Sequence, residues 1–420
     1  MVGRCFALWR DSAGLMHVLF VHRSGSGQFA HLIQRLVAEG GEVTLVTEKP
    51  EPDRPGVRQI AYSVGEPATA HATLAATDYH VRTGEAVAAE LSRLHRHDRP
   101  DAILGHVGWG GMLFAKDAMP GVPLIGYCEY FYNAAGSDLD FDPAFTVPEA
   151  ERRRIRMRNA AQLVTLQTLD FAYAPTRWQQ RQYPRALQQR IAVCHDGIDI
   201  HFCRPDGQAT FTLPDGRVLR PGDPVVTFAA RDLDPYRGYP QFMRAAARIA
   251  QERPDVVFVA VGGDGPGYGR PRPDGRLWRE VMLEETGLGD RIVHIPWLAH
   301  ADLVRLFQVS AAHVYLSVPF VLSWSMLEAM ACGALIVGSA TPPVQEVIRH
   351  GVNGLLAPFF DEARLARTVI AALDRQAAVA PLRAAARQTV MARYEREACV
   401  DHQLGFIGRL VAEDDLLAAQ

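Results

Sequence analysis

The feature that most limits the fold of this 420-residue chain is a repeated order of short apolar run, turn and helical segment. The first instance runs from an apolar stretch at 17–22, through a glycine turn at 24–27, to a helical pattern at 29–39 and a second apolar stretch at 42–47. Strands that alternate with helices in this way form parallel sheets covered by helices on both faces. The sequence therefore predicts an α/β fold.

The alternation stops once and then restarts, which indicates two domains. The Pro/Gly-rich stretch 206–224 interrupts it. Further strands are expected at 101–105, 123–127, 161–165 or just after it, 190–195, 225–229, 256–261, 291–295, 313–317 and 335–338. Helices are expected at 81–97, 148–159, 239–253, 301–308, 325–332, 343–350 and over most of 380–418.

The length suits two domains of ordinary size. We expect an N-terminal domain at 16–200 and a C-terminal domain at 201–395, with residues 1–15 outside the fold. A last helical segment, 396–420, either stays with the second domain or crosses back to the first.

Composition excludes several classes of protein. Hydrophobic residues make up 48% of the chain and charged residues 22%, which is typical of a globular protein and not of a disordered one. The formal charge is 44 − 47 = −3, so no basic field predicts nucleic-acid binding. The absence of a long apolar run or a convincing signal peptide predicts a cytoplasmic protein, with attachment to the inner face of the membrane left open. Six scattered cysteines without C-x-x-C spacing predict reduced thiols and no structural zinc.

Two loops at expected strand ends are candidates for phosphate contact. Gly25, Gly27 and Ala30 form a G-x-G-x-x-A pattern, with Glu48 at the end of the next strand. This pattern suits a dinucleotide, another phosphate-facing turn or a purely structural turn. Arg231 and Arg237 follow the first strand of the second domain, where two guanidinium groups can hold a diphosphate.

The segment from Ser317 to Gly333 carries the most information. A strand is expected to end at Ser317 and a helix to begin near Ser325. The start of a helix offers free N–H groups and a positive dipole end to phosphate. Glu328, in the first turns of that helix, suits a ribose diol better than a phosphate.

Residues 313–361 resemble the donor-site signature of family 4 glycosyltransferases, which have the GT-B fold. The motifs that carry the resemblance are Leu327–Gly333 (L-E-A-M-A-x-G), Ser339 with Glu346–Leu356, Val261–Pro266 (V-G-x-G-P), His195–Asp199 (N-G-V-D) and, in the first half, His22–His31. The resemblance covers about residues 16–370. It implies two facing Rossmann-like domains with a cleft between them.

The resemblance also implies roles for single residues. Arg231 and Arg237 take the paired cation positions of the family and His106 that of the histidine facing the donor sugar. Donor contacts are further implied for Gly263, for Glu328 and for the backbone amides of Val321, Leu322 and Ser323. Glu129 is a weaker candidate for facing the acceptor. The chain departs from the family at Phe320, where the E-x7-E motif has its first glutamate.

The implied function is that of a retaining, metal-independent glycosyltransferase of bacterial polysaccharide or glycoconjugate synthesis. Its co-substrate is a nucleotide-diphosphate sugar, its acceptor a glycan, a lipid-linked sugar or a small molecule, and it needs no cofactor and no metal. The D-x-D matches at Asp138–Asp140 and Asp232–Asp234 are interpreted as coincidence. The arginine-rich helix at 152–158 is either solvated or attracted to an anionic membrane or acceptor. A dehydrogenase, a sugar-nucleotide epimerase and a catalytically silent nucleotide-sugar-binding protein are the alternatives; the oligomeric state is left open.

Overall fold

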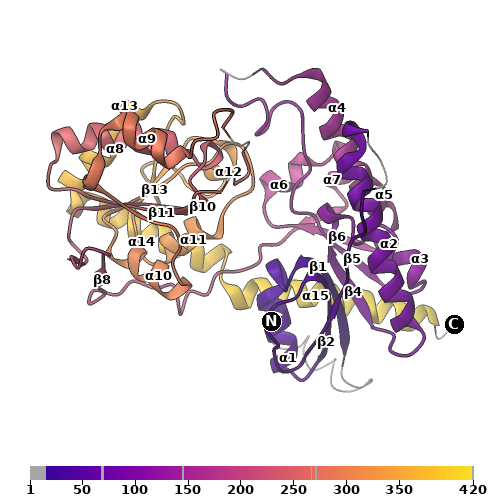
Figure 1. Ribbon diagram of the computed structural model, residues 1–420. Coiled ribbons are helices and arrows are strands. Elements are labelled where there is room, and N and C mark those ends of the chain that lie inside the picture. The colour runs from indigo at the N-terminus through magenta and orange to yellow at the C-terminus, as the bar shows by residue number, and fades with distance from the viewer. Residues whose placement is uncertain (1–15, 68–70, 144–145, 266, 270–271, 419–420) are drawn as a thin grey trace. The chain divides into compact units, whose positions relative to one another are not determined.

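The structure is a computed structural model that describes residues 16–67, 71–143, 146–265, 267–269 and 272–418. The chain divides into two compact units. Unit 1 comprises the residues up to Gly197 together with those from Arg396 onward, and unit 2 comprises Ile198–Glu395 (Figure 1). The prediction for residues 1–15 falls outside the described residues. The segment from Arg396 belongs to unit 1 although it follows unit 2 in the chain.

Unit 1 is a parallel sheet of seven strands in the order β3-β2-β1-β4-β5-β6-β7. Its strands are β1 (His17–Ser24), β2 (Glu42–Lys49), β3 (Val57–Ala61), β4 (Ala102–His106), β5 (Leu124–Tyr127), β6 (Phe171–Ala174) and β7 (Ile191–Val193). Its helices are α1 (Ala30–Ala38), α2 (Ala75–His95), α3 (Ala115–Ala118), α4 (Glu149–Arg158), α5 (Ala160–Thr168), α6 (Arg177–Gln182), α7 (Arg185–Gln188) and α15 (Arg396–Ala418).

Alternate residues of the central strand β1 point to opposite faces of this sheet. Val18 and Phe20 pack into a core shared with α1 and α15, whereas Leu19 and Val21 pack into a core shared with α2 and α5. The α15 side chains in the first core are Val400, Leu404, Phe406 and Ile407. Both faces of the sheet are therefore covered, as a parallel sheet requires.

Unit 2 has a parallel six-stranded sheet in the order β12-β11-β10-β13-β14-β15 and a small antiparallel pair, β8-β9. Its strands are β8 (Phe211–Thr212), β9 (Val218–Leu219), β10 (Val225–Asp232), β11 (Val257–Gly263), β12 (Ile292–Ile295), β13 (Ala312–Tyr315), β14 (Ile336–Ser339) and β15 (Leu355–Ala357). Its helices are α8 (Tyr239–Glu252), α9 (Trp278–Thr286), α10 (His300–Val309), α11 (Trp324–Ala331), α12 (Pro342–Gln345), α13 (Glu362–Asp374) and α14 (Gln376–Arg393).

Helices also cover both faces of the second sheet. On one face, Val225 and Val259 share a core with buried residues of α10, α11 and α14. On the other, the ring of Phe228 stacks on Phe242 of α8, with ring centroids 4.9 Å apart. This packing fixes the carboxyl ends of β10 and β13, where the predicted donor-site loops begin.

The two crossings between the units lie side by side. Ile198 and Glu395 form a parallel β-bridge, and the N–H of Ile198 donates to the carbonyl of Tyr394 at 2.7 Å. Gly197, at φ +93°, lies against Arg396 so closely that a Cβ on it would be 2.7 Å from the Arg396 Cα. Glycine is therefore needed at the first crossing.

The predicted fold class is confirmed: the molecule has two α/β units, each built on a parallel sheet. For one strand, two positions were predicted, and the first of them is wrong. Residues 161–165 lie in α5, and the strand is the segment just after it, β6. The edge strands β3 and β15 were not predicted, and the predicted helix at 343–350 is reduced to the short α12.

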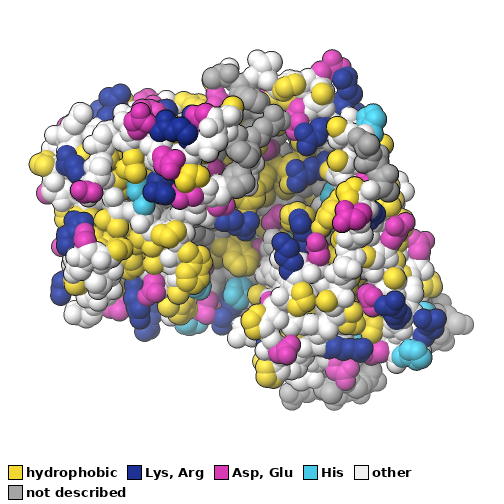
Figure 2. Space-filling model, in the orientation of Figure 1, with side chains coloured by type: hydrophobic (Ala, Val, Ile, Leu, Met, Phe, Trp, Pro, Cys, Tyr) yellow, Lys and Arg dark blue, Asp and Glu magenta, His cyan; other side chains and the backbone are white. Residues whose placement is uncertain are grey.

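The surface carries both signs of charge. On the face shown in Figure 2, basic and acidic side chains are interspersed over each unit. Among the described residues, no helix is long and apolar enough to cross a membrane.

Candidate active site

A polar pocket in unit 2 lies at the carboxyl end of β10. The strand β10 ends with Arg231 and Asp232, and a short 3-10 helix, Pro235–Arg237, follows. Arg231 is exposed, whereas the Arg237 side chain is buried. The pocket is lined by Ala229, Ala230, Arg231, Asp232, Asp234, Arg237, Gly267, Tyr268, Tyr315 and Ser323.

Arg237 is held in place by three groups from the strand β13 and the loop after it. Its Nη1 donates to the Ser317 hydroxyl at 2.8 Å, to the Val321 carbonyl at 3.0 Å and to the Tyr315 hydroxyl at 3.2 Å. All three acceptors are neutral, and the ion pairs found among the described residues include neither Arg231 nor Arg237. The pocket therefore combines two guanidinium groups outside any such ion pair with the carboxylates of Asp232 and Asp234, and the guanidinium groups suit a diphosphate.

The start of α11 faces the same pocket through Ser323. The Ser323 hydroxyl caps the helix by accepting from the N–H of Ser325 at 3.3 Å, and the Ser323 N–H donates to the Tyr315 hydroxyl at 2.8 Å. In the described part of the chain, the N–H groups of Val321 and Leu322 have no hydrogen-bond partner. Of the three predicted backbone donors, Val321 and Leu322 thus remain available, whereas Ser323 already has an acceptor.

Phe320 belongs to an aromatic cluster beside the pocket. Its buried ring packs against Tyr268, with centroids 4.9 Å apart, and against Tyr236 at 5.7 Å. The guanidinium groups of Arg231 and Arg237 lie 5.7 Å and 5.5 Å from the centroid of the Tyr268 ring. Cation–π attraction at this distance helps to hold both arginines. Phe320 therefore supplies packing where its relatives' motif has a carboxylate.

Glu328 lies on α11 and is not free in this structure. Its Oε1 is 2.8 Å from Nε2 of His300, the first residue of α10. Hydrogen bonds with Cys203 and Glu328 raise the pKa of His300 to about 10, so the pair is an ion pair at neutral pH. The side chain of Glu328 is 12% exposed, so its second oxygen is accessible to a ligand only in part.

The carboxylates of Asp232 and Asp234 act within the loop. Asp232 accepts from the N–H of Gly265 at 3.1 Å, while Asp234 accepts from the N–H groups of Arg237 and Tyr268 at 3.1 and 2.9 Å. A Cβ on Gly263 would lie 3.0 Å from Asp232, so this predicted donor residue is tightly packed against the same loop. These bonds hold the loop in place, so the two aspartates of this D-x-D pattern have a structural role.

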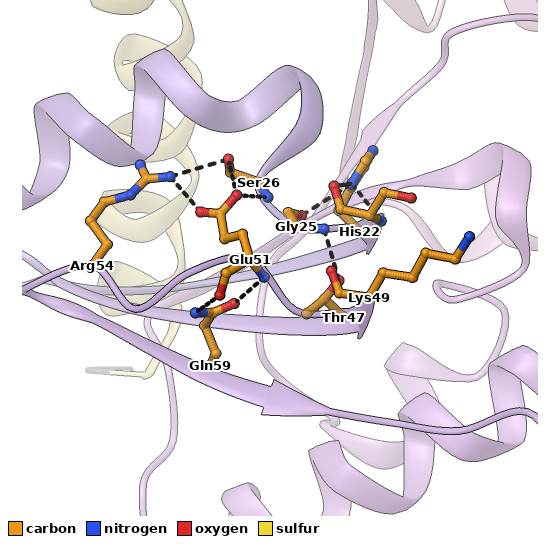
Figure 3. A network of polar contacts seen from close by, with 9 residues as sticks. His22, Gly25, Ser26, Thr47, Lys49, Glu51, Arg54 and Gln59 are labelled. Carbon is orange, nitrogen blue, oxygen red and sulfur yellow. Dashed lines mark hydrogen bonds and ion pairs between the residues drawn. The ribbon is translucent and has the colours of Figure 1, made fainter.

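The glycine turn of unit 1 already holds an anion of the protein itself (Figure 3). The Glu51 carboxylate accepts from the N–H of Ser26 at 3.0 Å and from its hydroxyl at 2.9 Å, and it is bonded to Arg54. Burial raises the pKa of Glu51, but the bonds from Ser26 and the charge of Arg54 outweigh it and leave the pKa below its ordinary value. A Cβ on Gly25 would lie 2.6 Å from this carboxylate.

The second glycine of the turn leaves space for a histidine ring. Gly27 has φ +48°, and a Cβ on it would lie 2.1 Å from the His22 imidazole. Burial, and the neighbouring His106, lower the pKa of His22 to about 4, so its ring is neutral at pH 7. Gly25 and Gly27 therefore have clear structural reasons to be glycine, and their assignment to donor binding stays a prediction.

His106 and Glu129 come together at the ends of β4 and β5. His106 Nδ1 accepts from the N–H of Gly108 at 3.0 Å, so Nε2 carries the proton that points at Glu129, 3.2 Å away. The other Glu129 oxygen accepts from Gln28 at 2.7 Å. Burial raises the pKa of Glu129, but the hydrogen bonds from His106 and Gln28 outweigh it and lower the pKa overall. Sequence reasoning did not identify Gln28 as a neighbour of this pair.

A second pocket lies in unit 1 between α2, α4 and Trp109. It is lined by Arg23, Ala72, Thr73, Ala76, Tyr79, His80, Trp109, Glu151, Arg154, Ile155 and Arg158. Two buried polar atoms, His80 Nδ1 and Trp109 Nε1, lack a hydrogen-bond partner among the described residues. Burial, with the charges of Arg158 and Arg23, lowers the pKa of His80 to about 4.

The three arginines of this pocket differ in how far they are neutralised. Arg23 pairs with Glu48 at 3.0 Å and Arg154 with Glu151 at 2.9 Å. Arg158 instead donates to the Tyr132 hydroxyl at 2.8 Å and stacks on that ring, 3.7 Å from its centroid. It forms no ion pair within the described ranges. Glu48 is thus a partner of Arg23, where a dinucleotide fold would use such a carboxylate for ribose.

The predicted residues thus form two groups, one in each unit. The structure brings together Arg231, Arg237, Gly263, Val321, Leu322 and Ser323 in unit 2, with Glu328 farther along α11, and Gly25, Gly27, His106 and Glu129 in unit 1. Tyr268 and Tyr315 were missed because a tyrosine in a Gly/Pro-rich loop and one at a strand end carry no spacing signal.

Each half of the chain matches a family of glycosyltransferases. Residues 39–203 match the glycosyl transferase family 4 group, and residues 214–389 match the glycosyl transferases group 1. D-inositol 3-phosphate glycosyltransferase of Mycobacterium sp. (strain JLS) is 30% identical over 186 residues, which are 44% of this chain and 40% of that protein. The enzyme of the same name from Catenulispora acidiphila is 28% identical over 206 residues, 48% of each chain.

Solved structures show the same fold over nearly the whole chain. Sucrose-phosphate synthase from Thermosynechococcus elongatus has a TM-score of 0.72 at 20% identity, covering 96% of this chain and all of that one. HepE of Anabaena, in complex with UDP and glucose, has a TM-score of 0.65 at 16% identity, covering 93% and 98%. The alignments with curated relatives, by contrast, span under half of those proteins' length.

Taken together, the two family matches cover the core of both units, and the fold is that of GT-B glycosyltransferases. The chain belongs to the group 1 glycosyltransferases of family 4.

Proposed function

We propose that the protein is a retaining glycosyltransferase that moves a sugar from a nucleotide-diphosphate sugar to an acceptor carrying an anionic group, without a catalytic metal. The observation that carries the donor half is the pair of arginines, Arg231 and Arg237, that form no ion pair among the described residues and lie at the carboxyl end of β10. The start of α11 and the unpartnered N–H groups of Val321 and Leu322 lie on the neighbouring loop. Departure of a nucleoside diphosphate puts negative charge where these groups can stabilise it.

The stereochemical part of the proposal rests on what the pocket lacks in the described residues. Asp232 and Asp234 are engaged in loop hydrogen bonds and form no opposed carboxylate pair of the kind a double displacement needs. The acceptor hydroxyl therefore attacks C1 from the face the phosphate leaves. The bond from C1 to phosphate oxygen breaks, the bond to acceptor oxygen forms, and the acceptor proton passes to the departing phosphate.

UDP is the first nucleotide to test, because a structural neighbour, HepE, is described in complex with UDP-glucose. A thermal-shift series with UDP, GDP, ADP and NAD⁺ separates the donor proposal from the dehydrogenase alternative, since a ligand that binds the folded state raises its stability by mass action. We expect stabilisation by one nucleoside diphosphate and none by NAD⁺. Stabilisation by NAD⁺ alone would contradict the donor site.

The acceptor half of the proposal rests on the second pocket of unit 1. Arg158, without a carboxylate partner in the described residues, suits a phosphate or carboxylate, whereas Arg23 and Arg154 are already paired with Glu48 and Glu151. The unpartnered His80 Nδ1 and Trp109 N–H suit hydroxyl groups. The name of the matched curated relatives includes a phosphorylated polyol, which is an acceptor of this chemistry.

The acceptor is tested by transfer from the donor sugar to matched pairs of polyols with and without a phosphate. We expect transfer to the phosphorylated member and a KM for it that rises at least tenfold in Arg158→Gln, because a charge-assisted bond is lost. Equal use of both members of each pair would contradict an anionic acceptor. Retention is checked by the anomeric configuration of the product, and metal independence by turnover that is not lost in chelator.

A catalytically silent nucleotide-sugar-binding protein is the second candidate, and Phe320 is the observation that favours it. The buried ring removes the carboxylate that the family's motif places beside the donor sugar. Binding of the nucleotide sugar without transfer or hydrolysis, across the same polyol panel, is the result that distinguishes this candidate.

A further inference from the structure

Three side chains able to bind a metal converge in unit 2, and one of them lies on α11, the helix whose capping residue Ser323 lines the pocket of Arg231 and Arg237. They are Cys203 in the segment that enters the unit, His300 at the start of α10 and Glu328 on α11. The Cys203 Sγ, a His300 ring nitrogen and a Glu328 carboxylate oxygen all lie within 4.8 Å of one another. The three residues come from separate segments, so no C-x-x-C or H-x-x-H spacing marks them in the sequence.

The ligand set selects the class of metal. A thiolate, an imidazole and a carboxylate form a usual ligand set for Zn²⁺, whereas Mg²⁺ and Ca²⁺ prefer oxygen ligands alone. Bonds of ~2.0–2.3 Å to a tetrahedral Zn²⁺ place pairs of ligand atoms roughly 3.3–3.8 Å apart. His300 Nε2 and Glu328 Oε1 are 2.8 Å apart and would separate slightly to admit the ion. The Cys203 Sγ lies within 4.8 Å of a ring nitrogen and a carboxylate oxygen of these two residues and would need only a small shift to reach the same ion.

The surroundings allow an ion to enter, and solvent supplies a fourth ligand. Cys203 is buried, but the His300 side chain is 55% exposed, so an ion can arrive from solvent through the imidazole. Water can then complete a tetrahedron, and coordination displaces the thiol proton of Cys203 and one proton of the His300 imidazolium.

We propose that Cys203, His300 and Glu328 form a binding site for a zinc-class divalent cation, and that the bound cation inhibits transfer by taking Glu328 away from the nucleotide. The second part rests on the proposed function, in which Glu328 contacts the ribose. The site is separate from the D-x-D patterns and plays no part in the transfer step. A chelator should consequently relieve inhibition, whereas it would abolish the activity of a metal-dependent enzyme.

Metal binding is tested without donor, acceptor or turnover. The reduced, metal-stripped full-length protein is titrated with Co²⁺ and Zn²⁺, and thiolate ligation is read from the near-ultraviolet charge-transfer band of the Co²⁺ complex. We expect one ion per chain and a thiolate band. Cys203→Ser should lose the thiolate band and bind the ion at least tenfold more weakly. His300→Ala should weaken binding by a similar factor.

Cys399→Ser is the matched control, because Cys399 is also a buried thiol but lies on α15 in unit 1. It should bind Co²⁺ as the wild type does. Circular dichroism and thermal unfolding verify that each variant is folded, and the exposed position of His300 makes His300→Ala the variant least prone to misfold. Equal affinity in wild type, Cys203→Ser and His300→Ala, or no thiolate band in the wild type, would overturn the site.

Inhibition is tested by measuring UDP binding with and without Zn²⁺ in wild type and Cys203→Ser. Zn²⁺ should weaken UDP binding at least tenfold in the wild type and leave it unchanged in Cys203→Ser. Equal weakening in both would overturn the inhibitory part while leaving the Co²⁺ result intact. If no nucleoside diphosphate binds either protein, the proposed function fails, and the Co²⁺ titration still decides the metal site.

Discussion

The loops that follow the first strand of each sheet differ in whether their arginine side chains are already ion-paired with a carboxylate. After β1, the turn at Gly25–Gly27 presents the N–H of Ser26 to Glu51, a carboxylate of the same unit. After β10, Arg231 and Arg237 face a pocket, and no ion pair neutralises them in the described part of the chain. Two loops with similar places in two similar folds thus carry different electrostatics. Fold position alone does not identify a phosphate site; what matters is whether the arginines of the loop already form ion pairs within the protein.

The largest test of this comparison removes the arginines of unit 2 that form no ion pair among the described residues. Arg231→Ala and Arg237→Ala should each reduce transfer by about two to three orders of magnitude, because each removes a donor aimed at the leaving diphosphate. Arg237→Lys should recover little, because lysine keeps the charge but lacks the guanidinium Nη1 group that bonds Ser317 and Val321.

Steady-state kcat and KM for the donor measure this effect. Arg253→Ala is the matched control, since Arg253 forms an ion pair with Asp255 at the surface and should change turnover less than twofold. Wild-type turnover in Arg231→Ala or Arg237→Ala would remove the basis for the donor assignment.

The second test concerns Glu328, which lies on α11 in the same unit as Arg231 and Arg237. Glu328→Ala should cut transfer by about two orders of magnitude if its carboxylate holds the ribose diol. Glu284→Ala, at an exposed glutamate paired with Arg276, is the control. The donor KM should rise in the first variant and stay unchanged in the second, and a normal KM in Glu328→Ala would separate this residue from the nucleotide.

The third test acts on the closed turn of unit 1. Glu51→Gln removes the anion that Ser26 and Arg54 bind, so it should lower the free energy of unfolding by about 1–3 kcal/mol. It should leave donor KM unchanged if Gly25 and Gly27 are structural. Chemical denaturation and donor kinetics measure the two effects, and a changed donor KM would instead support the assignment of Gly25 and Gly27 to donor binding.

The smallest effect is a pH dependence of stability from buried neutral histidines. The pKa of His22 is lowered to about 4, chiefly by burial, with His106 adding to the effect and Ser24 and Glu129 opposing it. The ordinary pKa is near 6.5, so between about pH 6.5 and 4 the unfolded chain binds more protons than the folded one. Stability is therefore full above this window and falls as the pH falls through it.

Urea unfolding at pH 7, 6 and 5 measures that slope. His22→Gln should flatten it, whereas His201→Gln, at an exposed position, should leave it as in the wild type. An unchanged slope in His22→Gln would show that the ring does not titrate differently in the folded protein. The effect belongs to unit 1, since His22 packs against Gly27 of the closed turn.

The sequence predicted the two-unit α/β fold because apolar strand runs and helical segments alternate plainly. It placed most strands and helices to within a few residues, but failed where local pattern and packing disagree. Residues 161–165 carry Leu163, Val164 and Thr165, which resemble a strand locally but lie in α5. The edge strand β3 was missed because its residues are half-buried or exposed and show no apolar run.

The donor residues were predicted from motifs, which are patterns of residues close together in the sequence. Their neighbours were not, because Tyr268, Gln28 and His300 reach the sites from other segments. The sequence also could not reveal that Glu51 fills the glycine turn, since that contact depends on the register of β2 and the loop after it. Charge type can be read from a sequence, but the partner of each charge is a property of the folded chain.

The return of α15 to unit 1 has a consequence for synthesis of the chain on the ribosome. Val400, Leu404 and Ile407 complete one of the two cores of unit 1, yet they follow the whole of unit 2. Unit 2 is continuous in sequence and can finish folding as soon as Glu395 has emerged, whereas unit 1 must wait with part of one face of its sheet uncovered. The unit made first is therefore the unit completed last, and its apolar strands are exposed to aggregation for as long as unit 2 is being made.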